Sequence, residues 1–212
     1  MANVADCAFA VAKKDLDKLG GAITKCDGIM SGSEQKYAWN IEKDGVRKRV
    51  ISYSRYLATR AWGGDTIGYY EVNGEKMSAE DYDKLYSYRE GWHSTNNNKV
   101  CIDKYYSNEW CVDWTKLGSY SYDSDTWVQE YDDHITVYFG GRWSFPSELE
   151  DLLYEKGVEW QGAVVEDGCD VLDDELGNTD FNLRIEEEEN EYDGDTYTTH
   201  YIEDASTNAV RA

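Results

Sequence analysis

The residues with the clearest chemical potential are carboxylates near the end of the chain. Four consecutive glutamates, Glu186 to Glu189, are followed by Glu191, Asp193 and Asp195. A dense row of carboxylates attracts cations and basic protein surfaces, and it repels nucleic acids. Three interpretations follow for this row: a solvated strand end, a calcium site, or a mimic of the nucleic-acid backbone.

A calcium loop of the EF-hand type fits the row poorly. If Gly194 is the invariant glycine of such a loop, the loop begins at Glu189 and takes Glu191 and Asp193 as further ligands. The final bidentate glutamate then falls on His200, and the first ligand is Glu rather than Asp. A looser calcium site in an accessory protein stays open as an alternative.

The distribution of charge favours mimicry. The chain of 212 residues has a formal net charge of −22. Residues 1–120 contain 17 acidic and 17 basic side chains, whereas residues 121–212 contain 26 acidic and four basic ones, so the whole excess lies in the acidic half. Duplex DNA carries one charge per about 1.7 Å of axis, so an excess of 22 corresponds to about 37 Å of duplex, comparable to the long dimension of such a unit.

These carboxylates are expected on the surface, because burying them unpaired is costly. The aromatic content of 14% leaves side chains available for a specific interface. The acidic surface that we expect to contact a partner comprises Asp170, Asp173, Asp174, Glu175, Glu186, Glu188, Glu189, Glu191, Asp193, Asp195, Glu203 and Asp204.

A basic cluster lies between Arg47 and Arg60. Its simplest role is to pair with the acidic half, within one chain or in a homodimer. The alternative is a sponge for a signalling nucleotide, in which Arg47, Arg49, Arg55 and Arg60 bind phosphate and Tyr53 stacks on the base. The net negative charge argues against direct binding of duplex nucleic acid.

Sequence motifs of common enzyme classes are absent: there is no GxGxxG, Walker A, GxSxG or HExxH. The three histidines are far apart, and the five cysteines form no CxxC pair. Asp133 and His134 are reactive residue types, but neighbours in a strand point to opposite faces, so core or surface roles are expected for them. We therefore expect a protein that is not an enzyme, with no cofactor or metal and with reduced thiols in a cytosol.

Several elements must position these residues. Val4–Ala12 predicts a buried strand, and Asp44-Gly45 and Asn73-Gly74 predict two hairpins, of residues 36–57 and 66–77. Ser78 is expected to cap a helix whose apolar face is Tyr82, Leu85 and Tyr86. Residues 91–132 predict irregular structure with one or two short strands.

The acidic half predicts further strands around one helix. Residues 134–139 form a strand that Gly140-Gly141 ends, and a capping box at Ser147–Glu150 begins a helix that ends near Gly157. A loop of residues 166–178 precedes strands at 181–185 and 197–202, joined by a turn at Asp193-Gly194. The fold class is α+β with an antiparallel sheet and two to three helices. The chain divides into a charge-neutral half of residues 1–120, with an inserted Tyr/Trp-rich segment, and an acidic half of residues 121–212, or it forms one continuous domain.

Residues 134–168 contain a strand, then Trp143, Ser144 and Pro146 at a helix start, then a strand that closes in an acidic-Gly turn at Glu166 and Gly168. In these features the segment resembles the C-terminal part of the YubB-type ferredoxin-fold family of phage and plasmid proteins. The resemblance implies ferredoxin-like split β-α-β elements and an origin in a mobile element, and it supplies no catalytic residues.

These observations lead to one expected function. The protein is expected to be a phage or mobile-element anti-defence inhibitor, of the anti-CRISPR or anti-restriction type. Its acidic surface would block the nucleic-acid site of a host defence protein in the host cytosol. No run of 18 apolar residues exists, so no membrane partner is expected.

Overall fold

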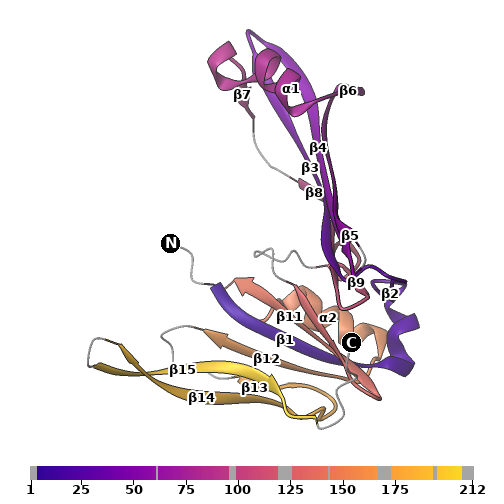
Figure 1. Cartoon of the computed structure of the whole chain (residues 1–212), viewed down its shortest axis with the longest axis vertical. Coiled ribbons are helices and arrows are strands. Elements are labelled where there is room, and N and C mark those ends of the chain that lie inside the picture. The colour runs from indigo at the N-terminus through magenta and orange to yellow at the C-terminus, as the bar shows by residue number, and fades with distance from the viewer. Residues whose placement is uncertain are drawn as a thin grey trace.

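The computed structural model describes residues 4–60, 62–95, 99–118, 126–142, 144–166, 173–192 and 195–206. The fold is α+β and consists mainly of antiparallel sheet. Figure 1 shows a body that contains both ends of the described chain and a long arm that projects from it. Within the described residues, no helix is long and apolar enough to cross a membrane.

The body is built on a five-stranded sheet. Its strand order is β10 (Trp127–Glu130), β11 (His134–Arg142), β1 (Val4–Ala12), β12 (Trp160–Glu166) and β13 (Asp173–Gly177), and each neighbouring pair is antiparallel. The α2 helix (Ser147–Lys156) connects β11 to β12, and the 3₁₀ helix η1 (Lys13–Leu19) follows β1.

Alternation along β1 gives the sheet two different faces. Cys7, Phe9 and Val11 belong to the main core, which also contains Leu149 and Leu153 of α2. The alanines of β1, at positions 8, 10 and 12, face the other side, where they form a second core with the hairpin of β14 (Leu183–Tyr192) and β15 (Asp195–Asp204). The body therefore has three layers, with α2 on one side of the sheet and the hairpin on the other.

The arm is a second antiparallel sheet. Its order is β2 (Ile23–Lys25), β9 (Trp110–Asp113), β8 (Lys99–Ser107), β3 (Ser31–Lys43), β4 (Val46–Thr59), β5 (Trp62–Val72) and β6 (Glu75–Met77), and β7 (His93–Ser94) also pairs with β3. The short 3₁₀ helix η3 (Trp114–Lys116) follows β9. A strand of 14 residues such as β4 spans about 46 Å, which explains the reach of the arm in Figure 1.

The tip of the arm has its own small core. Ile41, Val50 and Val72 are buried beneath aromatic side chains, including Tyr82 of α1 (Ala79–Tyr86). The rings of Tyr70 and Tyr82 stack with centroids 4.1 Å apart. The 3₁₀ helix η2 (Tyr88–Glu90) follows α1. This core fixes α1 on the sheet far from the body.

The strand, hairpin and cap signals between Val4 and Tyr86 are confirmed. β1, the two hairpins and the Ser78 cap, whose side chain accepts a hydrogen bond from the N–H of Asp81, all occur as expected. Leu85 is an exception, because it is 56% exposed and does not join the apolar face of α1.

Other expectations were wrong. Residues 91–132 contain the nine-residue strand β8 as well as β9 and β10, and the segment 166–178 contains β13. β11 continues through Gly140 and Gly141 to Arg142. The N-cap of α2 is Pro146, with no side-chain capping bond, so the capping box at Ser147 does not form.

The charge boundary near residue 120 does not divide the body. β1, from the neutral half, is the central strand of a sheet whose other strands all come from the acidic half. The arm, in contrast, consists entirely of residues from the neutral half.

Candidate functional site

The acidic end of the chain folds into the β14–β15 hairpin, and one end of this hairpin packs on the body. Phe181 and Leu183 are buried against the alanines of β1 and Ala163 of β12, whose small side chains allow close approach. The side-chain oxygen of Gln161 accepts hydrogen bonds from the N–H groups of Phe181 (2.7 Å) and Leu183 (3.0 Å). Its amide nitrogen donates to the Leu183 carbonyl (3.2 Å). Gln161 thus fixes the start of the hairpin to the sheet.

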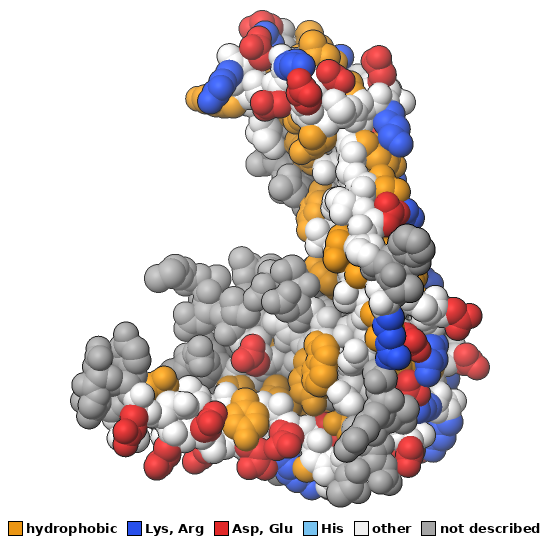
Figure 2. All heavy atoms as spheres, in the orientation of Figure 1, with side chains coloured by type: hydrophobic (Ala, Val, Ile, Leu, Met, Phe, Trp, Pro, Cys, Tyr) orange, Lys and Arg blue, Asp and Glu red, His pale blue; other side chains and the backbone are white. Residues whose placement is uncertain are grey.

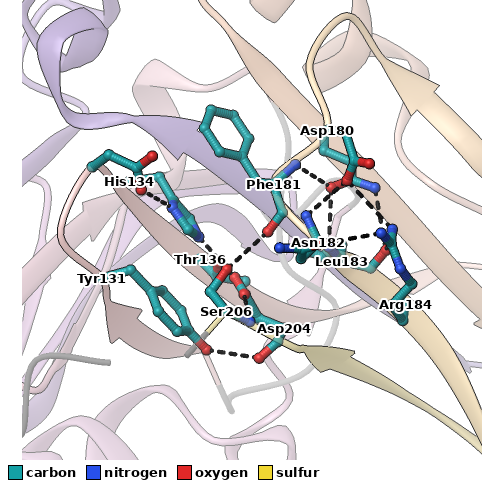
Figure 3. A network of polar contacts seen from close by, with 12 residues as sticks. Tyr131, His134, Thr136, Asp180, Phe181, Asn182, Leu183, Arg184, Asp204 and Ser206 are labelled. Carbon is teal, nitrogen blue, oxygen red and sulfur yellow. Dashed lines mark hydrogen bonds and ion pairs between the residues drawn. The ribbon is translucent and has the colours of Figure 1, made fainter. Parts of the chain in front are cut away.

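A buried polar network fixes the end of the hairpin, as Figure 3 shows. Oδ2 of Asp204, the last residue of β15, lies 2.9 Å from Nε2 of His134 and accepts a hydrogen bond from Oγ1 of Thr136 (2.5 Å). The ring of His134 stacks between Tyr131 and Phe181, with centroids 4.7 Å from each. One imidazole therefore contacts both Phe181, just before β14, and Asp204, at the end of β15, which lie at the same end of the hairpin.

The electrostatics of this network favour the imidazolium form of His134. Its Nδ1 lies 2.6 Å from Oδ1 of Asp133, so both ring nitrogens face carboxylates. Burial lowers the pKa of His134, but the hydrogen bonds to Asp204 and Asp133 outweigh burial and raise the pKa above its ordinary value. Burial raises the pKa of Asp204, but hydrogen bonds from His134, Thr136 and Ser206 outweigh it and lower the pKa.

The network anchors the hairpin. The side chains of His134 and Asp204 are 2% and 0% exposed, so they are sealed from solvent and from any substrate. Of the two roles expected for His134, core or surface, the structure gives it the core role. The assignment of Asp204 to the acidic surface was wrong, because Asp204 is buried to pair with a histidine 70 residues away in the sequence.

The remainder of the hairpin presents carboxylates on both faces. Ile185 lies opposite Ile202, which packs on the body, and Glu187, Glu189 and Glu191 follow Ile185 on the same face. Glu186 and Glu188 lie on the opposite face, as does Glu203. All six glutamates are exposed. Figure 2 shows acidic side chains along the margin of the molecule that β14 and β15 form in Figure 1.

The spacing of these charges matches that of one DNA strand. Antiparallel strands advance about 3.4 Å per residue, and each strand of duplex DNA carries one charge per about 3.4 Å of axis. Glu186 to Glu189 are consecutive in β14, so this strand reaches the linear charge density of a DNA strand, divided between two faces.

Elsewhere in the body, lysines of the neutral half pair with two carboxylates of the acidic half. Glu130 pairs with Lys13 (2.8 Å) and Lys25 (2.9 Å), and Glu159 pairs with Lys14 (2.6 Å). Burial raises the pKa of Glu130, but hydrogen bonds from Lys13, Lys25 and Trp110 outweigh it and lower the pKa to about 2.

The hairpin lacks such compensation. Glu187 forms a contact of 3.2 Å with His200, whereas Glu186, Glu188, Glu189 and Glu191 form no ion pair with any described residue. These four glutamates thus form a row of exposed, unpaired carboxylates along one strand, within the described structure.

The remaining members of the expected acidic surface are only partly placed. Asp173, Asp174 and Glu175 lie in β13 and Asp195 begins β15, but their side chains lie outside the described part of the structure. Asp170 and Asp193, with the expected turn at Asp193-Gly194, lie outside the described residues.

The arginines of the basic cluster form a row instead of a pocket. Arg47, Arg49, Tyr53 and Arg55 occupy alternate positions on one face of β4, and Arg60 follows the strand. The distance along a strand from 47 to 60 is about 43 Å, too long for one nucleotide. Among the described ion pairs, Arg55 pairs with Asp65 of the arm (3.1 Å), and none of these arginines pairs with the acidic half.

The described side chains contain no cluster of three or more His, Cys, Asp or Glu residues arranged to hold a metal ion. Glu189 and Glu191 lie in a continuous strand, whereas the EF-hand alignment requires a loop at these positions.

Comparison of the sequence with models of known protein families finds no matching family, and comparison with curated proteins finds no significant match.

Proposed function

We propose that this protein is a non-enzymatic inhibitor whose acidic hairpin occupies the nucleic-acid site of a basic partner protein. The observation that carries the proposal is the row of exposed, unpaired glutamates on β14, in a hairpin anchored at one end by Gln161 and His134. A disordered acidic tail would lose conformational freedom on binding, whereas this hairpin presents its charges in a fixed register.

We further propose that the partner is a host defence protein and that the inhibitor belongs to a phage or mobile element and acts in the host cytosol. The resemblance of residues 134–168 to YubB-type proteins supports this source. The ferredoxin-like part of the proposal has support from the strand order, since β1 lies between β11 and β12 and α2 connects those two strands.

The test begins with affinity capture from the natural host and continues with competition on the captured protein. Labelled DNA is titrated against the preformed complex at two salt concentrations. We expect DNA and inhibitor to exclude each other, with an affinity that falls steeply as salt rises, because both bind the same basic surface. A stable ternary complex with little dependence on salt would refute mimicry.

Matched variants locate the contact. One variant replaces four hairpin glutamates with glutamine: Glu186, Glu188, Glu189 and Glu191. Its control neutralises four exposed carboxylates of the arm, Glu75, Glu80, Asp83 and Glu90. We expect the first variant to lose most of its affinity and salt dependence and the control to keep both. Equal losses, with both variants folded, would contradict the assignment to the hairpin.

A further inference from the structure

The two edges of the hairpin differ in a way that charge alone does not explain. β14 forms one edge and carries the row of glutamates. β15 forms the other edge, and from Thr196 to Ile202 it reads Thr-Tyr-Thr-Thr-His-Tyr-Ile, without acidic residues, lysine or proline. Natural sheets usually block exposed edges with lysine, proline, a bulge or a very short strand. β15 has ten residues in continuous register with β14 and shows none of these features.

The hydrogen-bonding pattern identifies which backbone groups of β15 face this free edge. In an antiparallel pair, alternate residues bond the neighbouring strand, and the residues between them point away from it. The N–H of Ala205 donates to the carbonyl of Asn182 (3.1 Å), so Ala205 is one of the residues that bond the neighbouring strand. The alternating residues, whose backbone groups point away from β14, are therefore Thr196, Thr198, His200, Ile202 and Asp204. The carbonyl of Asp204 does point away from β14, since it accepts a hydrogen bond from Tyr131 (3.2 Å).

The free edge borders a pocket. In the described structure β15 pairs only with β14, and its Tyr201 and Ile202 line a pocket of about 320 Å³ against the body. Asp6, Tyr138 and Gly140 contribute to the rest of its lining. Tyr138 of β11 gives this lining an aromatic ring, which suits a cationic side chain with a long aliphatic stem.

Charge selects the occupant of the edge. A second copy of the chain would bring one net charge of −22 against another, and this repulsion opposes pairing of two β15 edges. An extended segment that carries arginine or lysine is attracted by the same field. We propose that β15 is a docking edge to which the partner adds a basic extended segment as a third strand, with one cationic side chain in the pocket beside Tyr201. This inference rests on the proposed function, because it takes the partner to be the basic protein that the hairpin inhibits.

The test uses two labelled seven-residue peptides, one alternating arginine with valine and one alternating glutamate with valine. They are titrated against the full chain and against Thr198→Pro and Thr198→Val. Proline removes an N–H that faces the free edge and leaves the bonds to β14 intact, whereas valine keeps the N–H. We expect only the arginine peptide to bind, with affinity reduced about tenfold or more by Thr198→Pro and unchanged by Thr198→Val.

Hydrogen exchange provides a second readout at single amides. The arginine peptide should protect the amides of Thr198, His200 and Ile202 more than those of Tyr197 and Thr199, which already bond β14. Equal binding by folded Thr198→Pro, or protection confined to other strands, would overturn the proposal. The proposal would also be overturned if the wild-type chain formed a dimer and Thr198→Pro were monomeric, because the β15 edge would then bind a second copy of the chain.

Failure of this inference and failure of the proposed function give different results. If Thr198→Pro still competes with DNA for the captured partner at full strength, the docking edge is refuted and the inhibitory function stands. If the arginine peptide docks on β15 but the chain never competes with DNA, the docking edge stands and the mimicry is refuted.

Discussion

Replacing Asp204 with alanine should release the hairpin from the body. The substitution removes the carboxylate that bonds Nε2 of His134 and Oγ1 of Thr136, and it leaves a buried, protonated imidazole with one partner fewer. Removing one partner of a buried ion pair costs about 3–5 kcal/mol. The neighbouring change Glu203→Ala is the control, because Glu203 is exposed and forms no described ion pair, and it should cost less than about 0.5 kcal/mol.

Urea denaturation measures the total cost, and hydrogen exchange shows where it falls. We expect Asp204→Ala to accelerate exchange in β14 and β15 more than in β11 and β12, because the sheet keeps its core with α2. Equal stability of the Asp204 and Glu203 variants, or uniform acceleration across the body, would refute the anchoring role.

The same network makes hairpin docking depend on pH, with opposite signs for its two groups. The folded pKa of His134 is raised, so its contribution is complete below about pH 6.5 and is lost as pH rises through the folded pKa. The folded pKa of Asp204 is lowered, so its contribution is complete above about pH 3.9 and is lost as pH falls through the folded pKa. Docking should be strongest between these limits, and His134→Gln should remove the alkaline decline. Hydrogen exchange of β15, measured as a function of pH, reports the docking of the hairpin. If docking of His134→Gln declined at alkaline pH as much as docking of the wild-type chain, the assignment to His134 would be contradicted.

Three further predictions concern the framework. Leu153→Ala should lower the free energy of unfolding, measured by urea denaturation, by about 2–5 kcal/mol, because Leu153 is fully buried beneath the sheet. The dependence of this free energy on urea concentration should not change if only the core is affected. Ser78→Ala should cost about 1 kcal/mol and loosen α1 in hydrogen exchange, whereas Ser87→Ala, whose side chain makes no capping bond, should do neither. The pKa of Glu130 is lowered to about 2, so its stabilisation is present above about pH 4.3 and is lost as pH falls toward 2; Glu130→Gln should flatten this acid limb of the stability curve.

Local signals in the sequence predicted those elements whose cause is local. Asp44 and Asn73 have φ angles of 49° and 50°, so the hairpin turns depend on the residues that form them. The Ser78 cap depends on a contact three residues away. In β8, Asp103 and Lys104 interrupt the apolar pattern, and the strand exists because β3 and β9 pair with it from distant parts of the sequence.

Glycine in β11 shows why a local reading of a residue can fail. Gly140-Gly141 predicted the end of a strand, but a Cβ at Gly141 would lie 2.6 Å from Sγ of Cys7. The glycine at 141 thus permits close packing against β1 within a continuing strand. The candidate site also combines local and distant causes. The exposure of the glutamates on β14 could be predicted from their charge alone. The burial of Asp204 depends on His134, which is 70 residues away in the sequence.

The placement of charge explains how the fold tolerates it. In the body, Glu130 and Glu159 contact lysines, so the central sheet gains ion pairs from the acidic half. The glutamate row of β14 lies on a two-stranded element whose described core contacts are at its anchored end, so the mutual repulsion of the exposed glutamates is solvated and screened. An isolated hairpin of two strands is only marginally stable, so the Gln161 and Asp204 contacts, together with the buried Phe181 and Leu183, hold the glutamate row in register. The anchor and the charged surface are therefore one functional unit, and a variant that frees the hairpin should weaken partner binding without changing a single exposed charge.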